Sequence, residues 1–166
     1  MAINSPRVLR TRRNHALEHA SIHVLSAKNP HRKLAGHSDA GGFWLLGDLT
    51  SEEVRQAVEE AARRLRAGER WLAVHPNCGT NLMTAATLSG LAGGVAMRGA
   101  SRRGGLLERL PLAILLSVVA LMAARPLGAR LQERVTTSSD LGPLHVVDIR
   151  RRQRGQLTMH RVETRS

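Results

Sequence analysis

Residues Asn14–His23, which read NHALEHASIH, place several side chains that can bind a metal on one predicted helix. In an α-helix His15 and His19 lie one turn apart, with about 6 Å between their Cβ atoms, and two imidazoles at this spacing can bind one ion. Glu18 lies about 60° around the helix from His15, where its carboxylate can reach a water on that ion without being a ligand. The stretch therefore predicts a helix that carries half of a metal site.

This helix also has a simpler interpretation, in which its histidines and glutamate only hydrogen bond to their neighbours. The residues around them are largely apolar, so the polar side chains would be half buried and would need partners. His23 extends the series, but it lies about 12 Å from His15 along the axis and is expected to pack beside the site rather than to share the ion. The H-x-x-E-H order favours the metal site.

A second polar motif, HPNCGTN at residues 75–81, follows a run at 71–75 that reads as a β-strand. It holds two further candidate ligands, His75 and Cys78. Cys78 lies where a helix is predicted to begin, and a helix N-terminus favours the thiolate. One of the two would supply the third ligand to the histidine pair, whereas a purely structural turn would simply bury the cysteine. Because Cys78 is the only cysteine and lies beside a histidine, we favour the ligand role, and the choice between His75 and Cys78 stays open.

The hydrophobic periodicity predicts an α+β fold. Thr50 and Glu53 form a capping-box pattern in front of apolar residues at helical spacing, which is a strong signal for a helix start. Turn-forming residues separate two short extended runs before this helix. The expected unit is α-β-β-α-β, with elements at about 12–26, 34–37, 42–46, 50–67 and 71–75.

Two apolar segments follow. Gly79–Met97 contains no charge over 19 residues, and Leu110–Ala124 is strongly apolar over 15. Their lengths approach the roughly 20 residues that cross a bilayer, so they predict a two-helix transmembrane hairpin. The alternative is a buried helix pair in a soluble protein. The glycines at 90, 93 and 94 would let another helix approach closely, including one from a second copy of the chain.

Beyond a linker near residues 138–143, two β-like runs at 144–149 and 156–162 predict a C-terminal β-hairpin that joins the sheet. His145 and His160 alternate with apolar residues there and are expected to be packing or surface histidines. The predicted domains are a soluble α+β domain at 1–78, the helical hairpin at 79–131 and a basic tail at 132–166.

Composition limits the partners. The formal net charge is +12, from 25 basic and 13 acidic residues, so the surface should attract phosphate, as in anionic lipid headgroups. With one Phe, two Trp and no Tyr, the chain lacks the stacking platforms of single-stranded nucleic-acid binders. The N-terminal 13 residues read as a basic arm without a cleavable signal peptide. We expect a multi-pass protein of the cell inner membrane with cytoplasmic termini.

Two motifs carry a resemblance. Residues 13–20 and 74–81 are similar to those of a bacterial family of small membrane proteins of unknown function, over residues 12 to about 97. That resemblance implies a membrane location and pairs the two motifs. Locally, His15, Glu18 and His19 resemble inverted-zincin metallopeptidases, which implies zinc on the histidines and Glu18 as the general base. The downstream acid of those enzymes has no counterpart here.

The sequence thus predicts a membrane-anchored Zn²⁺-dependent hydrolase, in first place a peptidase acting on a peptide or a membrane protein. His15, His19 and His75 or Cys78 would hold the metal at the membrane surface. The alternative is a non-catalytic membrane protein whose polar cluster or metal is structural and which acts in the assembly or regulation of a membrane complex. A nucleic-acid binder is a less favoured third hypothesis.

Overall fold

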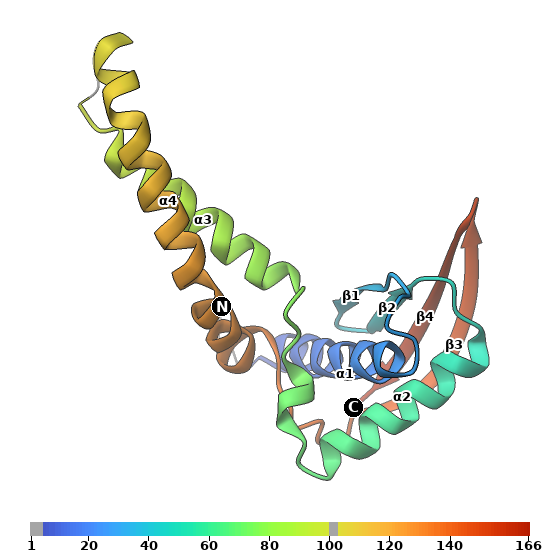
Figure 1. Ribbon diagram of the computed structural model, residues 1–166. Helices are drawn as coiled ribbons and strands as arrows, with labels where there is room; N and C mark the ends of the chain where they lie inside the picture. Colours follow the sequence, from blue (N-terminus) through green and yellow to red (C-terminus); the bar gives the residue numbers. More distant parts are fainter. Residues whose placement is uncertain (1–4, 100–102) are drawn as a thin grey trace. The chain divides into compact units, whose positions relative to one another are not determined.

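The computed structural model describes residues 5–99 and 103–166. They form four α-helices and one antiparallel four-stranded sheet of order β1-β2-β4-β3 (Figure 1). The chain divides into two compact units. One contains α1, α2, a short 3₁₀ helix η1 and the sheet, and the other contains α3 and α4. The mixed helix-and-sheet fold that the sequence predicted is therefore confirmed.

The first helix, α1, spans Pro6–Lys28 and begins earlier than predicted. Proline is favoured in a first turn because its missing N–H is not needed there, and Pro6 follows Ser5 in extended conformation. Residues 6–13 of the predicted basic arm are thus part of the first helix. Arg12 then donates hydrogen bonds to the carbonyl oxygens of Arg134 and Thr137, at 2.9 and 3.0 Å.

The predicted hairpin is confirmed as β1, Ala35–Asp39, and β2, Gly42–Leu46. Asp39 pairs with Gly42, so Ala40 and Gly41 form the turn. Gly42 has a φ of +146°, and a Cβ there would overlap the carbonyl oxygen of Val162. Glycine is therefore required where β2 meets the C-terminal part of the chain.

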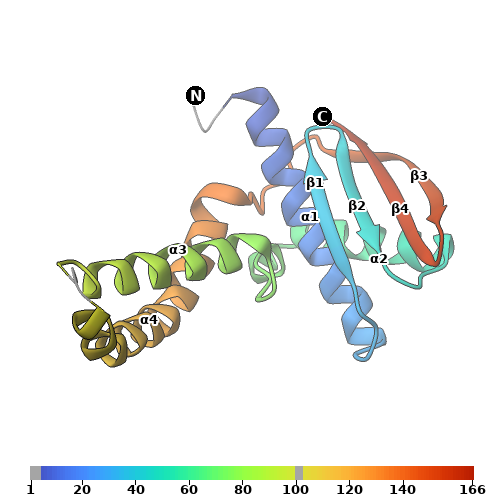
Figure 2. The same cartoon turned by 90° about the horizontal axis from the view of Figure 1, so that it is seen from above.

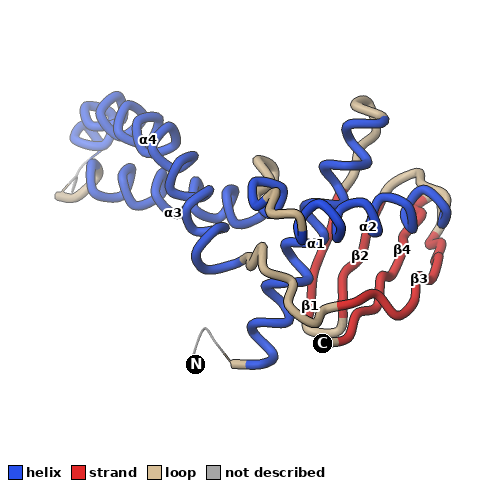
Figure 3. Tube along the Cα trace, turned by 90° about the horizontal axis from the view of Figure 1, so that it is seen from below, coloured by secondary structure: helices blue, strands red, loops and turns tan. Residues whose placement is uncertain are grey.

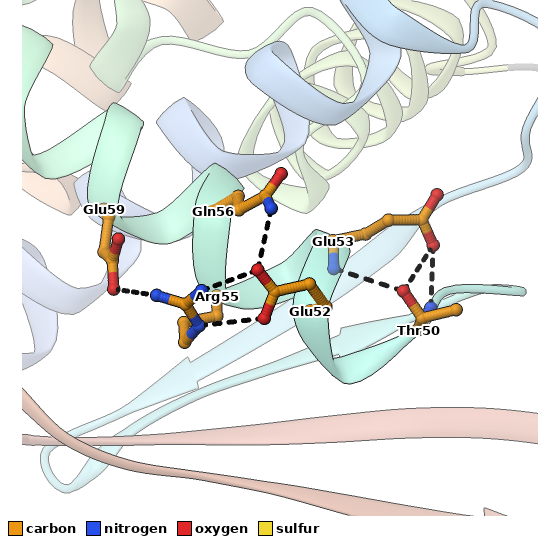
Figure 4. Close-up of polar contacts among 6 residues, drawn as sticks. All are labelled: Thr50, Glu52, Glu53, Arg55, Gln56 and Glu59. Carbon is orange, nitrogen blue, oxygen red and sulfur yellow. Dashed lines mark hydrogen bonds and ion pairs between the residues drawn. The ribbon is translucent and has the colours of Figure 1, made fainter.

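The helix α2, Ser51–Arg66, has the predicted capping box (Figure 4). The Glu53 backbone N–H donates to Thr50 Oγ1 at 3.2 Å, and the Thr50 N–H donates to Glu53 Oε2 at 2.8 Å. Arg55 on the exposed side bonds both Glu52 and Glu59. The opposite face is buried through Val54, Ala57, Val58, Ala61 and Leu65.

The strand predicted at residues 71–75 is wrong, because Arg70–Ala73 form the 3₁₀ helix η1. Leu72 and Ala73 are buried at adjacent positions, which a tight helical turn allows and the alternation of a strand does not. The place beside β2 that a third strand would occupy is taken by β4. The expected α-β-β-α-β order is corrected accordingly.

The C-terminal hairpin is confirmed and consists of β3, His145–Arg154, and β4, Leu157–Arg165. It joins the sheet through β4, where Phe43 of β2 lies opposite Val162 (Figure 2). Alternate residues of β4 are buried, from Thr158 through His160 and Val162 to Thr164. They face α1 and α2, which lie along one side of the sheet (Figure 3).

The second unit pairs α3, Gly79–Ala96, with α4, Arg103–Leu131. Ser89 and Ser117 each donate to the other's carbonyl oxygen, at 3.2 and 3.1 Å. A Cβ on Gly93 would come within 2.9 Å of Ser117 Oγ, so this glycine permits the close approach. The loop that joins the two predicted apolar segments, residues 98–109, is partly helical, since α4 begins at Arg103 and continues through Pro111 and Pro126. Residues 100–102 of that loop lie outside the described residues.

Among the described residues, one helix, Gly105–Thr136, is long and apolar enough to cross a membrane. Its last turn is a π-helix, η2, at Gln132–Thr136. Only 6% of its apolar window is buried, and side chains such as Leu107 and Met122 are 72% and 70% exposed. A buried helix pair of a soluble core would show the opposite pattern.

Candidate metal centre

Four histidines form a row in the unit that contains the sheet. The rings of His15 and His19 on α1 lie 4.3 Å apart between centroids. His75, just after η1, continues the row at 5.8 Å from His19, and His23 lies 4.9 Å from His75. The two motifs that the sequence singled out, 56 residues apart between His19 and His75, are therefore brought together by the fold of η1 against α1.

Backbone carbonyls orient the first two rings. Nδ1 of His15 lies 3.0 Å from the Thr136 oxygen, and Nδ1 of His19 lies 2.8 Å from the Ala73 oxygen. A carbonyl oxygen can only accept, so each Nδ1 carries the proton and Nε2 carries the lone pair. Hydrogen bonding of one ring nitrogen to a carbonyl is the usual support of a metal-binding histidine, because it fixes the tautomer and the ring direction.

Cys78 provides a third donor. It is the N-cap residue of α3, is buried, and its sulfur accepts a hydrogen bond from the Thr80 N–H at 3.4 Å. Cys78 belongs to the unit that contains α3 and α4, whereas His15 and His19 belong to the unit that contains the sheet. Two imidazoles and one thiolate are ligands that Zn²⁺ prefers, and the donor set fits this metal.

His75 lies beside these donors and is half buried. Burial, together with the charges of His23 and His19, lowers the pKa of His75 to about 4. Its imidazole is therefore neutral at physiological pH, the form that binds metals. His23, which the sequence placed beside the site, directs Nε2 at the Val74 carbonyl oxygen at 2.8 Å and packs edge-on against Trp71. It supports the backbone just before His75.

Glu18, next to His19 in sequence, contacts β1. Its buried carboxylate accepts a short hydrogen bond from Ser38 Oγ on β1, and it fills the space in front of Gly36. Burial raises the pKa of Glu18, while the Ser38 hydrogen bond and electrostatic interactions with His15 and His37 oppose that rise. A carboxyl group with a raised pKa is a candidate functional residue.

Several supporting groups could not be read from the sequence. The carbonyls of Ala73 and Thr136 belong to residues with no chemical signature, and only the fold places them at the histidines. Asn14 is fully buried and links α1 to the sheet, donating to the Asp39 oxygen at 2.8 Å and accepting from Thr164 Oγ1 at 2.7 Å. In the sequence, the one signal for this role of Asn14 was its position next to His15.

The pattern of one protein family, described as a domain of unknown function (DUF6391), matches residues 10–149. The match extends past the 12–97 range of the resemblance and reaches into β3. An uncharacterized protein of Picosynechococcus sp. is 35% identical over 145 residues, which cover 78% of this chain and 67% of that protein. No solved structure matches.

Proposed function

The chain belongs to the family described as a domain of unknown function (DUF6391), which states no activity, and from the geometry of its own site we propose that it is a membrane-bound zinc hydrolase. His15, His19 and Cys78 would hold Zn²⁺, and Glu18 would be the general base. The observation that supports the proposal is the pair of imidazoles on α1, which are held through Nδ1 by carbonyl oxygens and lie 4.3 Å apart between ring centroids, as expected of two histidines that bind one metal.

The chemistry follows from these residues. Zinc held there would lower the pKa of a coordinated water toward about 7 and polarise a carbonyl group. Glu18 would take the proton of the attacking water, since burial favours its protonated form more than for an exposed glutamate. Ser38 would hold the carboxylate in place between these states. An amide bond of a peptide or membrane protein is the substrate class of the inverted-zincin pattern.

A membrane location is part of the proposal. The candidate span Gly105–Thr136 supports it. Residues before and after the α3–α4 segment belong to one packed unit, so the segment must leave and re-enter on the same side of a bilayer. If α4 crosses, the 18 residues of α3 must cross as well, which gives the two-span hairpin. His75 and Cys78 precede α3 directly, so the metal would lie at the membrane surface.

The first experiment measures bound metal in the purified full-length protein. We expect about one zinc per chain, lost in both His15→Ala and His19→Ala. His31→Ala is the matched control, because His31 is an exposed histidine outside the row. Wild-type protein that takes up no zinc from a metal-supplemented medium would remove the proposal.

A structural zinc centre is the second candidate, and two observations favour it. His75 is neutral and adjacent to His19, so it could fill a fourth position, and Glu18 is engaged with β1. Glu18→Gln separates the two. In the hydrolase, cleavage of a quenched fluorescent peptide library should stop while zinc stays bound, whereas a wild-type protein with zinc bound by four protein ligands and no cleavage indicates the structural role.

A further inference from the structure

A polar recess lies in the sheet-containing unit, away from the zinc donors. Residues 133–142 pass between the N-terminal half of α1 and the end of α2, leaving two adjoining cavities of about 550 and 410 Å³. Both are lined by Arg70, Glu133, Thr137 and Ser139. Arg12 and Arg66 also line the larger cavity. We call the two together the arginine recess.

The recess keeps its positive charge. Over residues 5–99 and 103–166, none of Arg12, Arg66 and Arg70 forms an ion pair. Arg12 and Arg66 donate to backbone carbonyls, which satisfy hydrogen bonds without neutralising the charge. The other arginines of α2, by contrast, are each paired with a glutamate, namely Arg55, Arg63 and Arg64.

Acidic residues do not cancel this charge. The Asp140 side chain is 84% exposed, lies 3.9 Å from Arg13, and accepts a hydrogen bond from the Gly142 N–H. Asp140 lines the larger cavity together with Glu133, and Arg13 compensates its charge. Glu133 remains as the one acid of the recess without an ion pair in the described ranges, against three arginines. A recess with a net positive charge and hydroxyl groups from Ser138 and Ser139 suits an oxyanion.

We propose that the arginine recess binds a small ligand or a chain terminus through a carboxylate or phosphate group. Arg12, held by three hydrogen bonds to Thr137 and Arg134, is the fixed part of the site. Arg66, at the end of α2, and Arg70, at the start of η1, are exposed and would provide the other charges for the anion. Ala73 lines the smaller cavity, and its carbonyl oxygen is the hydrogen-bond partner of His19 Nδ1. A bound anion would therefore lie near the backbone that orients the histidine row. The anion site does not require the metal.

The test is calorimetric titration of the full-length protein in an uncharged detergent at low salt. The probes are inorganic phosphate, N-acetyl-dialanine and the C-terminal amide of that peptide. We expect saturable binding of one anion per chain, weakened about tenfold or more in Arg70→Gln, since a charge-assisted hydrogen bond contributes about 1.5–3 kcal/mol. Arg66→Gln should weaken binding too. Binding of phosphate alone indicates a phosphorylated ligand, and preference for the peptide acid over its amide indicates a chain terminus.

Two controls decide the outcome. Arg63→Gln removes the same charge from α2 outside the recess and should bind as the wild type does. His19→Ala should also retain the anion, even if zinc is lost. Equal weakening in Arg63→Gln and Arg70→Gln would reveal only diffuse surface charge, and loss of binding in His19→Ala would place the anion on the metal. Either result, or no saturable binding, overturns the proposal.

Discussion

His160 is a fully buried imidazole on β4, outside the histidine row. Its Nε2 lies 3.3 Å from Ser51 Oγ, and its Nδ1 has no hydrogen-bond partner in the described part of the chain. Burial lowers the pKa of His160, and the charge of Arg151 lowers it further against a smaller opposite effect of Glu53. The folded protein therefore resists protonation of this ring more than the unfolded chain does.

The expected pH dependence has a definite sign. Below about pH 6.5 the unfolded chain takes up the proton first, so the free energy of unfolding should fall with falling pH until the folded pKa is passed. His160→Leu should keep the stability of the wild type near pH 8 and lose part of this decline. Melting temperatures of the wild type and of His160→Leu between pH 8 and 5 would measure this difference. Parallel curves for the two proteins would show that His160 does not cause the loss of stability.

Gly36 tests the position of Glu18. A Cβ at residue 36 would overlap the Glu18 carboxylate, which must then swing away from Ser38. Gly36→Ala should therefore reduce hydrolysis strongly, while zinc, whose proposed ligands are other side chains, stays at the wild-type level. Gly155→Ala, a glycine with open space at its Cβ position, serves as the control substitution. Full activity in Gly36→Ala would mean that Glu18 is not the base.

At the scale of elements, the capping box makes the most direct prediction. Thr50→Ala removes the acceptor for the Glu53 N–H and should destabilise the protein by about 1 kcal/mol. Thr50→Ser retains the hydroxyl and should remain near the wild type. Urea unfolding of the two variants measures the difference. Equal loss in both would indicate that the β-branched methyl group, not the cap, stabilises this helix start.

Local signals explain which elements the sequence predicted. The capping box and the two-residue hairpin turn depend on neighbouring residues, and both were found. The strand expected at 71–75 failed because burial of adjacent Leu72 and Ala73 is decided by packing against α1. The histidine pair on one helix face was predictable from helical spacing alone. The carbonyls behind it and the partner of Glu18 come from long-range folding, so the sequence could not name them.

At the scale of the whole molecule, the proposed two-span hairpin predicts a labelling pattern. In a Cys78→Ser background, cysteines introduced at Lys33 and Gln153 should react with an impermeant maleimide from the same, cytoplasmic side of the membrane. A cysteine at Arg98 should react only from the other side. Native Cys78 is the sole cysteine, so the background is clean. Reaction of all three positions from one side would exclude a transmembrane hairpin.

The strand order β1-β2-β4-β3 separates β2 from its neighbour β4 by more than one hundred residues of chain. During synthesis, the nascent protein must release α3 and α4 from the ribosome before β4 exists. Until then the outer edge of β2 offers unpaired backbone groups to any other extended segment, which is a route to aggregation. Messages truncated before codon 157 should therefore yield insoluble or degraded product.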